Sequence, residues 1–130
     1  MATAEYKLSL VMKLIGYTMI FAPVPFIFLL KSGWRWYPNQ VEYEWMVIVI
    51  YTVLGIFLVI GASDLANSKL LIDFTIWGAF VAHATVMVIE AALDWEAEWS
   101  HVSPWGDCLS FYLFAAVMLY LRLKVDFAKL

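Results

Sequence analysis

One short stretch of the sequence places an imidazole, a thioether and a carboxylate at helical spacing. His83, Met87 and Glu90 are four and then three residues apart, so they share one face of an α-helix that turns about 100° per residue. At a rise of about 1.5 Å per residue, His83 and Glu90 lie about 10 Å apart along the axis. Such a face could carry protons, hold a cation or position the polar group of a small amphiphile. Its structural interpretation is that His83 bonds to a neighbouring helix and Glu90 lies among the lipid headgroups.

Three aspartates are further candidates for ligand or proton binding. Asp73 lies about one helical turn inside the start of the same apolar stretch. Asp107 opens the last apolar stretch, where a carboxylate in the first turn of a helix can accept free backbone N–H groups. Asp64 belongs to a short polar segment in which Asn67 and Ser68 are available to cap the next helix. Asp107 and Asp64 therefore each have a structural interpretation beside the chemical one.

Two sets of residues have the spacing of metal ligands. Asp94, Glu98 and His101 follow one another at i, i+4 and i+7, and would present two carboxylates and an imidazole to a divalent ion if this segment were helical. A solvated acidic loop is the alternative. His83 and Met87, at i and i+4, also share a face, but an imidazole and a thioether prefer metals of different softness.

A cofactor is not required by the sequence. Ala79 stands four residues before His83, and a small residue at this spacing leaves room for a haem or pigment ring beside an axial imidazole. Many apolar helices meet this condition by chance, and one histidine would need a second copy or an open coordination position. Cys108 is the single cysteine, which excludes an internal disulfide and with it a membrane dithiol oxidoreductase.

The elements that position these residues follow from an apolar composition. Of 130 residues, 65% are hydrophobic and 15% are charged, against about 45–50% and about 25% in soluble domains. Four apolar stretches, at 14–30, 45–62, 70–93 and 105–121, each have the length that crosses a bilayer. Because their connections are short, neighbouring helices should be antiparallel. We therefore predict one transmembrane domain over 1–130, an all-α integral membrane four-helix bundle with up-down-up-down topology.

The basic residues predict how the bundle is oriented. Six of the eight lie in the tails and the second connection: Lys7, Lys13, Lys69, Arg122, Lys124 and Lys129. The first connection carries Lys31 and Arg35. Because basic residues collect on the cytoplasmic side, both termini are predicted to be cytoplasmic in a bacterial inner membrane. The net charge of −3 leaves no basic surface for nucleic acid.

Prolines and glycines predict the shapes and contacts of individual helices. Pro23 and Pro25 should kink or end the first helix, because a proline removes a backbone donor. Gly55 and Gly61 in the second helix and Gly78 in the third are small enough for close helix contact.

Several short motifs occur in order over most of the chain. They are Gly33-Trp34-Arg35-Trp36, Tyr51-Thr52-Val53-Leu54-Gly55, Ser63-Asp64, Asp73-Phe74-Thr75-Ile76-Trp77, His83-Ala84-Thr85-Val86-Met87 and Gly106-Asp107. In these motifs the chain resembles the BphX-like family of small four-span bacterial membrane proteins. The resemblance implies a four-span fold and draws attention to His83, Met87, Asp64 and Asp107 as polar motif positions. Glu90 departs from the neutral amide usual at its place. The family has no established activity to carry over.

Three function classes are consistent with these features. The preferred hypothesis is an accessory subunit in the bilayer that self-associates as a homo-oligomer or packs within a larger membrane complex. The alternative is a module that binds or transports a proton, a cation or a small amphiphile on the face of His83 and Glu90. A membrane enzyme for a hydrophobic substrate is the third, with His83 as acid or base and Glu90 or Asp107 tuning it. A cavity beside His83, at a point where four helices meet, would favour the binding or transport module and the enzyme over the accessory subunit.

Overall fold

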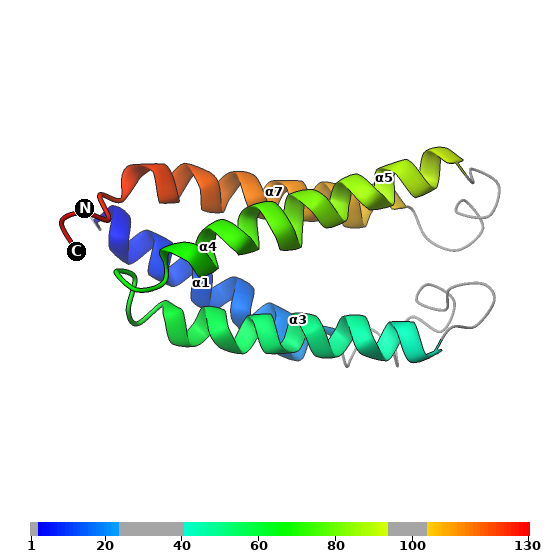
Figure 1. Cartoon of the computed structure of the whole chain (residues 1–130), viewed down its shortest axis with the longest axis horizontal. Helices are drawn as coiled ribbons and strands as arrows, with labels where there is room; N and C mark the ends of the chain where they lie inside the picture. Colours follow the sequence, from blue (N-terminus) through cyan, green and yellow to red (C-terminus); the bar gives the residue numbers. More distant parts are fainter. Residues whose placement is uncertain (1–2, 24–40, 94–103) are drawn as a thin grey trace.

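The computed structural model describes residues 3–23, 41–93 and 104–130, and these form four helical rods and no strand. In chain order the elements are α1 (Ala4–Phe21), α3 (Val41–Gly61), a third rod built from α4 (Lys69–Phe74), η1 (Thr75–Ala82) and α5 (His83–Leu93), and α7 (Pro104–Lys124). The rods alternate in direction, so both chain ends and the 62–68 turn lie at one end of the bundle (Figure 1). The predicted all-α, up-down-up-down arrangement of four helices is therefore confirmed.

Local signals set both ends of α1. The Thr3 side chain caps its start by accepting a hydrogen bond from the Tyr6 N–H at 3.3 Å, and a hydrogen bond with Thr3 lowers the pKa of Glu5. The helix ends at Phe21, where the Ala22 N–H still bonds to a carbonyl one turn back. This end directly precedes Pro23, as the proline pattern predicts. The second half of the predicted span, residues 24–30, lies outside the described residues.

One helix in the described part of the chain is both long and apolar enough to cross a membrane. It is the segment Lys69–Ile89, and Trp45–Gly61 is a shorter apolar helix. The first half of α1 carries Lys7 and Lys13, and the end of α7 is basic. The number and order of the helices therefore match the predicted bundle. Among the described helices, the third rod is the one with the length and apolar composition of a membrane span.

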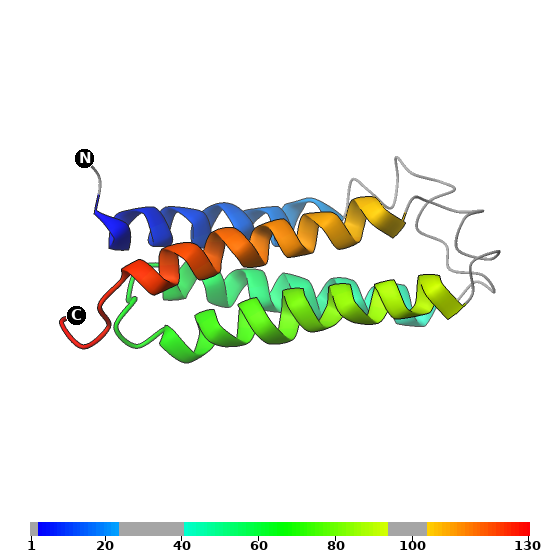
Figure 2. The same cartoon turned by 90° about the horizontal axis from the view of Figure 1, so that it is seen from above.

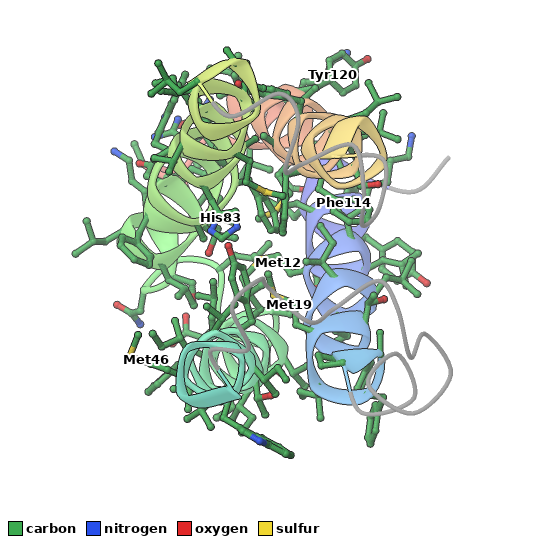
Figure 3. All side chains as sticks on the ribbon, turned by 90° about the vertical axis from the view of Figure 1, so that its right-hand side faces the viewer. Met12, Met19, Met46, His83, Phe114 and Tyr120 are labelled. Atoms are coloured by element: carbon green, nitrogen blue, oxygen red, sulfur yellow. The ribbon has the colours of Figure 1, made fainter. Side chains whose placement is uncertain are left out.

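The helices associate as two pairs that separate along the bundle. α1 packs along α3, and the third rod packs along α7, while α1 also contacts α7. Figure 1 shows that the two pairs lie close at the end that holds the termini and diverge toward the other end, and Figure 2 shows the same rods from above. Viewed from that other end, the helices surround a central space into which Met12, Met19 and His83 project, whereas Met46 and Tyr120 point outward (Figure 3).

The backbones of α1 and α3 touch at two facing glycines. A Cβ atom on Gly55 would lie 2.6 Å from the Gly16 carbonyl oxygen, and one on Gly16 would lie 2.7 Å from the Gly55 carbonyl oxygen. No side chain fits at such a distance. The predicted close contact at Gly55 is therefore confirmed, and Gly16 is its partner. Gly78, by contrast, is exposed, and a Cβ there would meet only the ring of Phe74.

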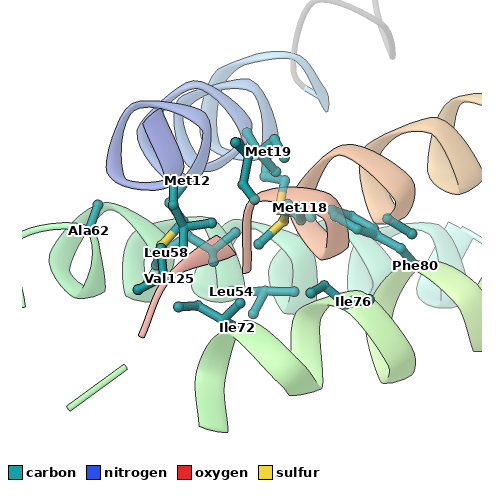
Figure 4. Close-up of a cluster of buried hydrophobic side chains, with 14 residues drawn as sticks. Met12, Met19, Leu54, Leu58, Ala62, Ile72, Ile76, Phe80, Met118 and Val125 are labelled. Carbon is teal, nitrogen blue, oxygen red and sulfur yellow. The ribbon is translucent and has the colours of Figure 1, made fainter. Parts of the chain in front are cut away.

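A continuous apolar core extends from the end that holds the termini to the wall of the cavity described below (Figure 4). Its fully buried side chains come from all four rods and include Leu8, Met12, Leu58, Ile72, Ile76, Phe80 and Met118. The turn beside this core is held by serine hydroxyls. Ser9 donates to the Ala62 carbonyl at 2.6 Å, and Ser68 donates to the Gly61 and Asp64 carbonyls at 3.0 and 2.7 Å.

The polar turn before α4 does not cap that helix as predicted. Ser68 occupies the N-cap position of α4, but its side chain makes no capping bond because the hydroxyl is used on the two carbonyls. Asp64 instead accepts from Asn67, through the backbone N–H at 3.3 Å and the side-chain amide at 2.8 Å. The turn is thus organised toward α3, and the capping prediction for Asn67 and Ser68 is wrong.

The third rod is not a uniform α-helix. Residues Thr75–Ala82 form a π-helix, a wider turn that occurs mostly as short segments and often near functional sites. The Tyr51 hydroxyl of α3 donates to the Ala79 carbonyl within it at 3.0 Å. Because the α-helical pattern resumes at His83, His83 and Met87 keep their predicted common face. The angular relation of Asp73 to that face differs from the one expected for an uninterrupted α-helix.

Candidate functional site

A cavity of about 260 Å³ lies between the four helices, in the half of the bundle away from the termini. Each rod contributes to its wall. The lining residues are Ile15, Thr18, Met19, Ala22 and Pro23 from the end of α1 and just beyond it, Val47, Ile48 and Tyr51 from the start of α3, Phe80, His83 and Met87 from the third rod, and Phe111 and Phe114 from α7. Ten of these thirteen side chains are apolar, which makes the cavity a site for an apolar molecule or group.

His83 lies in the wall of this cavity among aromatic rings. Its ring centroid is 5.1 Å from that of Phe111 and 5.5 Å from that of Tyr51, which it meets edge to face. Figure 3 shows the imidazole directed into the space that the helices surround. The side chain is half-buried. His83 is thus held by packing against α3 and α7, with part of its ring facing the cavity.

The two hydroxyl groups of the cavity wall are both engaged with carbonyl groups. Thr18 donates to the Leu14 carbonyl at 2.9 Å, and Tyr51 donates to the Ala79 carbonyl at 3.0 Å. The second bond joins α3 to the π-helical segment and fixes the Tyr51 ring against His83. Polar groups of the wall are therefore few and already oriented before any ligand binds.

The structure joins some of the predicted site residues and leaves others untested. Met87 lines the cavity with His83, as their spacing predicts. Glu90 lies in α5 and Asp107 in the first turn of α7, but their side chains lie outside the described residues. The predicted metal ligands Asp94, Glu98 and His101 also lie outside them. Within the described part, no group of three His, Cys, Asp or Glu side chains could hold a metal ion.

Asp73 and Asp64 lie at the opposite end from the cavity. Asp73 forms a two-point ion pair with Arg122 of α7, with Nε–Oδ1 and Nη2–Oδ2 distances of 2.7 and 3.0 Å. This hydrogen bonding raises the pKa of Arg122, whose guanidinium also lies 5.4 Å from the ring centre of Phe127. Asp64 is an exposed turn residue. Neither aspartate contributes to the site at His83, and both stabilise local structure.

Sequence reasoning did not identify Thr18, Tyr51 or the phenylalanines of the wall as site residues. Tyr51 lies in an apolar stretch with ordinary spacing, and nothing local indicates that its hydroxyl reaches the third rod. Thr18 stands in a helix whose polar residues are common. These residues are recognised only from the three-dimensional structure, because the site combines residues from four helices that are far apart in the sequence.

Comparison with known proteins places the chain in a family. No curated protein and no solved structure matches it. The resemblance to the BphX-like family stays a prediction. A family model described as a family of unknown function matches residues 2–127, nearly the whole chain. The chain therefore belongs to the DUF6632 family.

Proposed function

We propose that the protein is integral to a membrane, with its four helices crossing the bilayer. The outward faces of the bundle support this proposal, because they carry large apolar side chains along most of their length. On α3 alone, Val49, Ile50, Val53, Ile56, Phe57 and Ile60 are each 44% or more exposed. Apolar surfaces this extensive are rare on soluble monomers and normal against lipid.

The distribution of charge supports the predicted orientation. Five of the six described basic residues belong to the chain ends, the helix ends or the turn at the end that holds the termini, namely Lys7, Lys69, Arg122, Lys124 and Lys129, whereas Lys13 lies farther along α1. By the positive-inside rule this end faces the cytoplasm of a bacterial inner membrane. A fluorescent protein fused to the C-terminus should therefore fluoresce and a fused alkaline phosphatase should be inactive, with the protein resisting alkaline extraction from membranes. The opposite pattern of fusion activity would reverse the orientation.

The protein binds a small, mostly apolar molecule in the cavity beside His83. The observation that carries this function is that all four helices contribute to one cavity with a half-buried imidazole in its wall. An accessory subunit that only packs against its neighbours needs no such cavity. A cation is disfavoured, since no described lining residue carries a carboxylate. Self-association and a larger complex remain predictions.

The size of the cavity limits the ligand. An engineered apolar cavity of about 150 Å³ binds benzene, so about 260 Å³ suits two fused rings or one ring with a short chain. The wall also contains four aromatic residues, Tyr51, Phe80, Phe111 and Phe114, which offer flat surfaces for ring contacts. A bicyclic hydrocarbon such as indane therefore tests occupancy by shape and apolar contact alone.

Thermal unfolding of the protein in lipid nanodiscs tests this function. Saturating indane should raise the melting temperature by about 3 °C, because it binds the folded state. Val47→Phe fills the cavity from α3 and should abolish this rise. Val53→Phe makes the same change on the exposed face of α3 and should leave it intact.

Two results would contradict a binding function at this cavity. One is an absence of any saturable stabilisation by indane in the wild-type protein. The other is equal stabilisation of Val47→Phe and Val53→Phe, which would show that indane acts through the lipid or on another surface. Circular dichroism of both variants checks that the helices still form.

A further inference from the structure

The hydroxyl groups in the cavity wall can only accept a hydrogen bond from a ligand. Each hydroxyl has one hydrogen, and Thr18 and Tyr51 already direct theirs to the carbonyls of Leu14 and Ala79. The lone pairs of both oxygens remain available. A ligand that bonds to either oxygen without breaking an existing bond must therefore supply the hydrogen itself.

The described wall also opposes a charged ligand. Of its thirteen residues, none is an aspartate, glutamate, lysine or arginine, and ten have no polar side-chain atom that bonds strongly. Burying an unpaired ion in such surroundings costs far more than burying a neutral polar group. A carboxylate ligand would, in addition, meet only hydroxyl lone pairs at Thr18 and Tyr51.

From these two observations we infer that the ligand is an uncharged ring compound carrying an O–H or N–H group, which it donates to the Thr18 or Tyr51 oxygen. This inference rests on the proposed function and gives it a chemical class. It also predicts selectivity: a molecule of the same shape that lacks the donor cannot form this hydrogen bond to Thr18 or Tyr51. A cavity that selected its ligand by size alone would not discriminate between the molecule with the donor and the molecule without it.

Three bicyclic probes of nearly equal shape separate the donor from the ring. Indole has an N–H donor, benzofuran has an oxygen in its place, and indene has a CH₂ group. Competition for the cavity, measured by displacement of indane from the protein in nanodiscs, gives their relative affinities. We expect indole to bind about three- to tenfold more tightly than benzofuran and indene. Indole is the least apolar of the three, so partition into lipid would give the opposite order.

Variants identify the acceptor. The double variant Thr18→Val/Tyr51→Phe removes both hydroxyl oxygens and nearly preserves shape, so it should bind the three probes with equal affinity. Thr85→Val/Tyr112→Phe makes the same two changes at a hydroxyl pair that lies outside the cavity wall and should keep the preference for indole. The single variants Thr18→Val and Tyr51→Phe guard against misfolding of the double variant, since at least one should weaken the preference.

The possible outcomes separate the two proposals. Equal binding of indole, benzofuran and indene to the wild-type protein overturns the donor inference and leaves the cavity function standing. A preference for indole that survives in Thr18→Val/Tyr51→Phe also overturns it, because the acceptor is then elsewhere. Failure of all three probes and of indane to bind contradicts the proposed function itself.

Discussion

The two ends of the bundle are built from the same four helices in different ways. The closed end, which holds the termini and the 62–68 turn, is filled by side chains such as Leu8, Met12, Leu58 and Ile72, all with no exposed surface. The cavity end, around His83, keeps a cavity of about 260 Å³ between the same rods. Side chains therefore fill the space between the helices at the closed end, whereas they leave a cavity at the other end.

The difference lies in how large side chains are used. At the closed end, flexible aliphatic and methionine side chains interlock across helix pairs that lie close together. At the cavity end, rings contact one another tilted or stacked: Phe80 is tilted against Phe111 at 5.7 Å and against Phe114 at 5.9 Å, and Tyr51 is stacked on Phe111 at 5.8 Å. Rigid rings that support one another can line a space without collapsing into it. The closed end thus holds most of the fully buried packing, and the cavity end holds the proposed binding site.

The largest effect is expected at the glycine crossing of α1 and α3, the two helices of one pair. Gly55→Ala places a Cβ atom 2.6 Å from the Gly16 carbonyl oxygen, so α1 and α3 must separate at a cost of about 2–3 kcal/mol. Gly78→Ala is the control, because its Cβ would meet only a movable Phe74 ring and alanine favours a helix by up to about 1 kcal/mol. Unfolding by titration with SDS in micelles measures both. Equal destabilisation would mean that the crossing is not specific.

Truncating one side chain at each end tests the comparison directly. Leu58→Ala at the closed end removes a side chain with no exposed surface and should cost about 2–3 kcal/mol, since a cavity replaces its contacts. Met87→Ala at the cavity end only enlarges an existing space and should cost about 1 kcal/mol or less. SDS titration again provides the free energies of unfolding. If both truncations cost the same, the two ends do not differ in packing.

The sequence predicted the helices well because their signals are local. Long apolar stretches predicted the four rods that the structure confirms, and the proline pattern predicted the end of α1 before Pro23. Gly55 was correctly placed at a close contact, yet its partner Gly16 was not, because pairing depends on the crossing point of two helices.

The candidate site was predicted only along one helix. The spacing of His83 and Met87 gave their common face, since the period within an α-helix is fixed. The wall from α1, α3 and α7 could not be predicted, and neither could the π-helical segment, whose Ala79 carbonyl is bonded by Tyr51 from 28 positions earlier. The ion pair of Asp73 could not be predicted for the same reason: its partner Arg122 is 49 positions away, and only the folded bundle brings the two residues together.

The ion pair at the closed end should contribute less than its core. Asp73 and Arg122 are 32% and 22% exposed, and water screens a pair at that depth, although the two-point geometry strengthens it. A double-mutant cycle of Asp73→Asn and Arg122→Gln should give a coupling of about 1 kcal/mol that decreases as salt increases. The contact of Arg122 with the Phe127 ring is lost in both variants that change Arg122, so its contribution cancels in the coupling energy. A coupling near zero would assign the stability of this end to apolar packing alone.

The smallest effects concern single hydroxyl bonds at the two ends. Ser9→Ala deletes a half-buried bond of 2.6 Å to the Ala62 carbonyl at the closed end, and should cost about 0.6–1 kcal/mol because this carbonyl loses its side-chain partner. Tyr112→Phe deletes an exposed bond of 3.0 Å to Thr85 beside the cavity end, and should cost less than about 0.5 kcal/mol. Triplicate SDS titrations resolve this difference. If Tyr112→Phe proved the more costly, the hydroxyl pair of the third rod and α7 would hold the cavity end together, and its rings alone would not.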